Sequence, residues 1–160
     1  MKPVLLGMNN PHSASPVHAL YPTPIGATGH RIFEMLREAA RRSNVKVTSI
    51  GYIEAFDRIN LLNAVRGDPK EAKENVHNGL PLLKNRKVVV LGRKTAFAVG
   101  IKRPFNTHFF DHIDFKYCLI PHPSGLCREY NDPAVVRRIG DLLFDLYIES
   151  RNSNVSEDQE

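Results

Sequence analysis

The stretch that decides the fold of this 160-residue chain is IPHPSGLCR, residues 120–128. An apolar run over 117–120 precedes it and predicts a buried strand. Pro121 and Pro123 must end that strand, because each proline fixes its own φ and favours extended geometry in the residue before it. His122 is therefore held on a stiff loop at a strand's end, where open α/β sheets bind their ligands. A turn residue that bonds only its own backbone is the alternative interpretation of His122.

A second loop near the start of the chain has the same construction. Residues 4–6, VLL, predict a short apolar strand, and GMNNPHS over 7–13 breaks it with glycine, asparagine and proline. Two strand ends that both carry polar side chains on stiff loops favour a functional interpretation of His122.

Three segments together resemble the motifs of a known enzyme family. These are GMNNP at 7–11, INLLNAV at 59–65 and HPSG at 122–125. They are similar, in the same order along the chain, to the two active-site motifs and the middle strand of the uracil-DNA glycosylase superfamily. The resemblance spans residues 4–128, which is most of the chain.

The hydropathy pattern alternates between strands and helices and predicts an α/β fold. We expect one three-layer α/β/α domain over residues 1–151, with a mainly parallel four-stranded central sheet and a flexible polar tail over 152–160. The apolar run 87–91 indicates a strand buried on both faces, as in parallel sheets. Strands are also predicted at 3–6, 45–50 and 117–120, a strand end within 59–65, helices at 29–43, 68–76, 96–100 and from 131 onward, and a loop over 102–114.

Composition limits the partners that this chain is expected to have. Its formal net charge of +5 favours a polyanion such as single- or double-stranded DNA. Two cysteines are too few for a disulfide framework or a four-cysteine iron–sulfur cluster, and we expect no metal and no cofactor. No apolar run approaches membrane-spanning length and no signal-peptide pattern is present, so we expect a protein that does not bind membranes, in the cytoplasm or at the nucleoid. We also expect a monomer.

The resemblance implies hydrolysis of an N-glycosidic bond, with uracil or a related damaged or modified pyrimidine flipped out of DNA. It assigns His122 to the leaving base and an asparagine of the first motif to the attacking water. Asn9 matches when counted from Gly7 and Asn10 when counted from Pro11, so both stay candidates. An amide orients water but cannot accept its proton as a carboxylate does, and we therefore expect a slow or narrowly specific enzyme.

The same resemblance implies how base and DNA are held. Asn63 matches the family's pyrimidine-reading asparagine, with Asn60 as the alternative, because an amide offers one donor and one acceptor to a base edge. Tyr21 lies where the family stacks an aromatic ring on the base, although it could instead pack under its own loop. Met8 completes the expected base-binding set. The DNA-binding candidates are Ser124, Gly125, Leu126 as an apolar wedge, Arg128, and the cations Arg93 and Lys94 that follow the strand at 87–91.

Three other functions fit the same sequence. The chain could be a catalytically silent DNA-binding relative, or an enzyme that hydrolyses free nucleosides or nucleotides. A flavodoxin-like module that binds a small molecule is the third, although no Gly-x-Gly-x-x-Gly fingerprint supports a dinucleotide.

Overall fold

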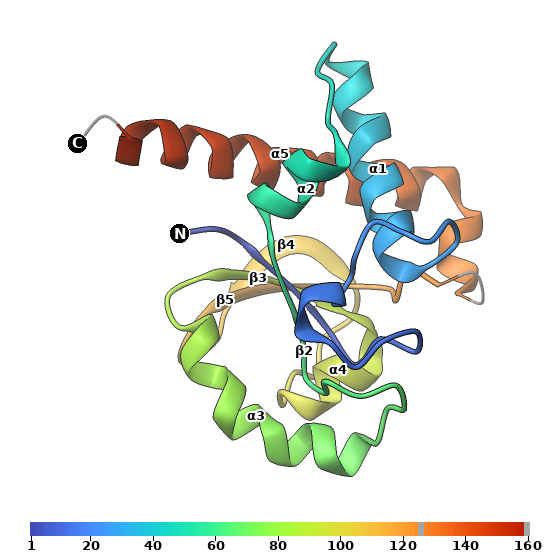
Figure 1. Cartoon of the computed structure of the whole chain (residues 1–160), viewed down its shortest axis with the longest axis vertical. Helices are drawn as coiled ribbons and strands as arrows, with labels where there is room; N and C mark the ends of the chain where they lie inside the picture. Colours follow the sequence, from blue (N-terminus) through green and yellow to red (C-terminus); the bar gives the residue numbers. More distant parts are fainter. Residues whose placement is uncertain (125–126, 159–160) are drawn as a thin grey trace.

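The structure is a computed structural model that describes residues 1–124 and 127–158, and only the backbone of residues 77–80 and 154–158. Figure 1 shows a central sheet with helices above and below it. In chain order the elements are β1 (Val4–Gly7), the 3₁₀ turn η1 (Pro16–His18), α1 (Thr28–Arg42), α2 (Ser49–Ala55), β2 (Asp57–Asn60), α3 (Pro69–Leu83), β3 (Lys87–Leu91), α4 (Gly92–Ala98), β4 (Asn106–Asp111), β5 (Lys116–Ile120), the 3₁₀ turn η2 (Arg128–Asn131) and α5 (Pro133–Asp158).

The strands form one sheet in the order β2-β1-β3-β5-β4. The first four run parallel, and β4 pairs antiparallel with β5. Gly7 pairs with Asn60, and Leu91 pairs with Ile120, so the four parallel strands end at one edge. The loops that follow them start from this carboxyl edge.

Alternate side chains of each strand enter two separate cores. Leu5 and Val89 face one core, which α1, α2 and α5 cover, whereas Leu6 and Val90 face the other, which α3 and α4 cover. The central strands are buried on both faces, and this explains their uninterrupted apolar runs. The predicted three-layer α/β/α architecture is confirmed.

The sheet has five strands instead of the predicted four. The additional strand, β4, lies within the stretch 102–114 that was expected to be a loop. It pairs on one side only, and its residues are half-buried or exposed. An edge strand of this kind lacks the apolar run that marks a buried strand, so the hydropathy pattern missed it.

The prediction of a strand at 45–50 is wrong. Val47 does enter the core, but Thr48 starts helix α2, and its Oγ1 accepts a hydrogen bond from the Gly51 N–H at 3.0 Å. A threonine that caps a helix ends the alternation that resembled a strand. The second strand of the chain is β2 instead, and it ends at Asn60, within the segment 59–65.

The helices also differ from their predicted limits. Helix α3 runs on to Leu83, and α4 begins at Gly92, directly after β3. Helix α5 continues to Asp158, past residue 152, where the polar tail was expected to begin. Among the described residues, none of the helices combines the length and apolar character that crossing a membrane requires.

Candidate functional site

Four chain segments with polar side chains leave the carboxyl edge of the sheet. The first motif follows β1, the middle motif follows β2, residues 92–94 follow β3, and the His122 loop follows β5. In the order β2-β1-β3, strand β2 pairs with one side of β1 and β3 pairs with the other. The connections that leave β1 and β2 therefore run in opposite directions across the sheet. Open α/β sheets bind ligands at such a point.

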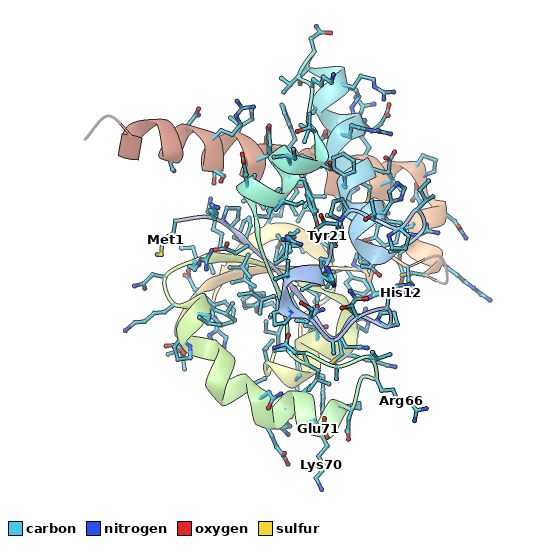
Figure 2. All side chains as sticks on the ribbon, in the orientation of Figure 1. Met1, His12, Tyr21, Arg66, Lys70 and Glu71 are labelled. Carbon is cyan, nitrogen blue, oxygen red and sulfur yellow. The ribbon has the colours of Figure 1, made fainter. Side chains whose placement is uncertain are left out.

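A cavity of about 530 Å³ opens at this edge. Asn9 and Asn10 of the first motif line it, together with Tyr21 and with Ser124 of the His122 loop. Figure 2 shows Tyr21 towards the centre of the molecule and His12 nearer its edge, both on the segment between β1 and α1. The tertiary structure thus brings two predicted site segments from opposite ends of the chain to one cavity.

The two asparagines of the first motif have different hydrogen bonds. Asn10 uses both ends of its amide within its own loop: Nδ2 donates to the His18 carbonyl, and Oδ1 accepts from the His12 N–H, each at 2.9 Å. Asn9 donates from Nδ2 to the Val65 carbonyl at 2.9 Å. No hydrogen bond to Asn9 Oδ1 is found in the described part of the chain, and this oxygen faces Gly67, where a Cβ would lie 2.6 Å from it.

The Tyr21 ring is half-buried at the cavity wall. The edge of the His18 ring meets it at 5.8 Å between centroids, and the Arg58 guanidinium lies 5.7 Å from its centre. Arg58, on β2, also donates to the Ala19 carbonyl at 2.9 Å, and the buried Tyr52 hydroxyl donates to the Leu20 carbonyl at 2.8 Å. These contacts fix the long loop that carries Tyr21.

Glycine is required where α1 meets this loop. A Cβ on Gly29 would lie 2.2 Å from the Tyr21 carbonyl oxygen, which is backbone and cannot turn aside. The start of the helix can therefore approach the loop closely only with glycine at this position.

His122 is half-buried at the end of β5. Gly92, at φ +84°, lies beneath it, and a Cβ there would be 3.0 Å from the His122 Cβ. Burial, and to a lesser extent the nearby charge of Lys94, lowers the pKa of His122 below its ordinary value. The imidazole is therefore neutral at physiological pH and has an N–H to donate.

The loop of His122 is held in place by hydrogen bonds to its backbone carbonyls. The Tyr130 hydroxyl donates to the Pro121 carbonyl, and the Ser124 N–H donates to the His122 carbonyl at 2.7 Å. His122 itself does not line the cavity, but Ser124 does. Gly125 and Leu126, predicted as DNA contacts, lie outside the described residues.

The predicted base-reading residues lie elsewhere. Asn60 and Asn63 line a second cavity of about 390 Å³, not the one that holds Tyr21. Asn63 is exposed, whereas Asn60 is buried and its Oδ1 has no hydrogen-bond partner within the described chain. This oxygen lies 2.6 Å from where a Gly7 Cβ would be, and Leu20, which lines the main cavity, approaches the same point to 3.5 Å.

Met8 does not join the main cavity either. Its side chain packs against the core beneath α3 and α4, on the opposite face of the sheet from α1. The predicted role of Met8 in base binding therefore gains no support from its position.

The predicted DNA-binding cations differ in whether their side chains pack against the protein or are exposed. Arg93 stacks on the Phe105 ring, with its guanidinium carbon 4.2 Å from the ring centre. Lys94 is exposed near His122, and Arg128 is exposed at the start of η2. Lys94 and Arg128 are therefore exposed cations that could contact a polyanion, Lys94 near His122 and Arg128 shortly after His122 in the sequence.

Two residues at the candidate site were not found from the sequence. His18 lines the cavity, and Arg58 supports Tyr21 from β2. A single histidine in a polar loop and a single arginine in a strand have no spacing that could have indicated this role. No group of three or more potential metal-ligating His, Cys, Asp or Glu side chains gathers among the described residues.

Fold and site together define an α/β protein whose candidate site lies at the carboxyl edge of a mainly parallel sheet. Neither a scan against models of protein families nor a search of curated proteins found a match for this chain. The resemblance to the uracil-DNA glycosylase superfamily therefore stays a prediction from sequence motifs.

Proposed function

We propose that this protein hydrolyses the N-glycosidic bond of uracil, or of a related damaged or modified pyrimidine, flipped out of DNA. The observation that carries the proposal is the shared cavity of the two motif loops. Asn9 and Tyr21 line it from one loop and Ser124 from the other, with His122 bonded to Ser124 through the backbone. A DNA substrate would place the protein in the cytoplasm or at the nucleoid, and we expect it to act there as a monomer.

The cavity can hold a flipped nucleotide. Its volume of about 530 Å³ lies within the range of small-molecule sites. A base inside duplex DNA cannot be reached, and flipping it out costs a few kcal/mol. Stacking on the Tyr21 ring would offset part of this cost.

His122 lies beside the cavity, next to Ser124 in the loop, and we assign to it the stabilisation of the leaving base. As the bond to the sugar breaks, negative charge develops on an oxygen of the pyrimidine. A neutral imidazole N–H can donate a hydrogen bond to this oxygen, an interaction typically worth about 3 kcal/mol in the transition state. The lowered pKa of His122 keeps the imidazole neutral at physiological pH.

Asn9 is the better candidate than Asn10 for orienting the water. The amide of Asn10 is engaged at both ends by its own loop, whereas within the described chain Asn9 forms a hydrogen bond through Nδ2 alone. An amide cannot accept the proton of the attacking water, so the enzyme will be slow unless another group accepts that proton.

The test is a gel assay on labelled oligonucleotides, single- and double-stranded, that carry uracil, other damaged pyrimidines or ordinary bases. Alkali then cleaves the strand wherever a base has been removed. We expect cleavage by the wild type and a loss of at least about 10²-fold in His122→Ala. His108→Ala, on the exposed strand β4, is the control and should cleave normally. Equal cleavage by His122→Ala would contradict the proposed role.

One observation favours a catalytically silent DNA-binding protein as the second candidate. Among the described residues that line the main cavity there is no Asp or Glu to accept a proton from water. This alternative predicts no abasic product from any oligonucleotide, with salt-sensitive DNA binding intact in both wild type and His122→Ala. Cleavage of free nucleosides or nucleotides without any need for a DNA strand would point to a nucleoside or nucleotide hydrolase instead.

A further inference from the structure

His18 is exposed, but backbone hydrogen bonds hold it at the cavity. Its carbonyl accepts from Asn10 Nδ2 at 2.9 Å and from the Tyr21 N–H at 3.2 Å. Arg58 donates to the carbonyls on both sides of it, those of Val17 and Ala19. The residue therefore cannot move away from the cavity without breaking the loop that carries Tyr21.

The imidazole ring of His18 is oriented as well as its backbone. Nδ1 lies 2.8 Å from Ser13 Oγ, which also accepts from the Ser15 N–H at 3.1 Å. If Nδ1 carries the proton and donates to Oγ, then Nε2 is the unprotonated nitrogen. The Ser13 hydroxyl can also donate to Nδ1, so the proposal below requires the tautomer in which Nδ1–H donates, as it does in general-base histidines.

We propose that His18 is the general base of this site, the group that accepts the proton of the attacking water. The inference rests on the proposed function. In the step, the water oxygen forms a bond to C1′ of the sugar while the C1′–N bond breaks. The electron pair of that bond leaves with the base, whose negative oxygen His122 stabilises, and the water proton passes to His18 Nε2. Asn9 Oδ1 orients the water but takes no proton.

The groups around the cavity leave His18 as the best-placed base. No carboxylate lines the described part of the cavity, and His12 is the other imidazole there. His12 lies on the exposed loop, and no hydrogen bond to its ring is recorded among the described residues. Tyr21 packs against the His18 ring, Arg58 donates to the carbonyls of Val17 and Ala19 on either side of His18, and His12 lines the same cavity.

The test is the pH dependence of the single-turnover rate on the oligonucleotide that the wild type cleaves best. We expect the wild-type rate to fall as the solution is made acidic, because a protonated imidazole accepts no proton. In His18→Gln the rate should be about 10²-fold lower at neutral pH, and this acidic fall should disappear. DNA affinity, measured by fluorescence anisotropy, should stay within about twofold of the wild type.

A second measurement separates a catalytic from a structural role. Added imidazole should restore part of the rate of His18→Ala, in proportion to its neutral form, because a small base can occupy the space left by the side chain. A variant that had only lost loop structure would not respond. The rate of His12→Gln should still fall in acid. If the acidic fall disappeared in His12→Gln but remained in His18→Gln, the proposal would be overturned.

The outcomes distinguish the two proposals. If the wild type is active and His18→Gln keeps both its rate and its pH profile, the general-base role is wrong and the glycosylase proposal stands. If the wild type yields no abasic product from any substrate, both proposals fail.

Discussion

At the scale of single residues, His122 shows how a loop can set the protonation state of a side chain. Burial at the end of β5 and the positive charge of Lys94 both disfavour the imidazolium. The proline-flanked sequence predicted a stiff loop. The lowered pKa, in contrast, comes from burial and from Lys94, which follows β3 and meets His122 only in the folded chain.

The lowered pKa of His122 has a consequence for stability. The folded state takes up this proton less readily than the unfolded chain, so stability should rise with pH between the folded pKa and about 6.5 and should then level off. His122→Asn removes the group and should make the loss of stability in acid shallower. Urea midpoints measured from pH 4.5 to 7.5 test this, with His108→Asn as control. The same slope in His122→Asn as in wild type would contradict the assigned shift.

The asparagines show the limit of motif matching at single residues. The motif matches Asn9 when counted from Gly7 and Asn10 when counted from Pro11, so the sequence made the two residues equal candidates for orienting the water. The structure separates them, because Asn10 is bonded within its own loop and Asn9 is bonded to Val65, far along the chain. Such hydrogen bonds have no signature in local sequence.

At the scale of elements, the long segment between β1 and α1 is ordered by contacts from other parts of the chain. Tyr52 of α2 and Arg58 of β2 each bind its backbone carbonyls, and Gly29 lets α1 approach it. The length of the segment and its prolines indicated a functional loop. They could not indicate that a tyrosine from α2 holds it.

Removal of the Tyr52 hydroxyl should loosen this segment. Tyr52→Phe leaves the Leu20 carbonyl without its donor in a buried environment, which typically costs about 1 to 3 kcal/mol of unfolding free energy. Hydrogen exchange should become faster over residues 16–27, and the cleavage rate should fall. Tyr147→Phe is the matched control, since its hydroxyl accepts from Arg151 of α5, away from this loop. If exchange over 16–27 stayed at the wild-type rate, Tyr52 would not be the anchor.

At the scale of the whole molecule, the net charge of +5 should act through the residues at the carboxyl edge. DNA affinity should fall steeply with salt, because bound phosphates release counterions. Arg128→Ala should reduce the slope of log K against log salt by about 1 if Arg128 neutralises one phosphate. The control is Arg41→Ala, in the last turn of α1, where its guanidinium pairs with Glu38. An unchanged slope in Arg128→Ala would remove this residue from the DNA contacts.

The sequence by itself determined the layered α/β fold and the edge at which the candidate site lies. Continuous apolar runs specify strands buried on both faces, and glycine, asparagine and proline after them specify stiff polar loops. These are local signals, so they can be read without the tertiary structure. The partly exposed edge strand β4 and the capped helix α2 were missed, because neither has a distinctive local pattern.

Only the tertiary structure decided which side chains share the cavity. It placed Tyr21 and Ser124 together, added His18, and put Asn60 in a separate cavity, buried against Gly7. The physical reason is that these relations depend on strand register and on hydrogen bonds between residues far apart in the chain. A shift of β2 by one residue against β1 would turn Asn60 to the other face of the sheet.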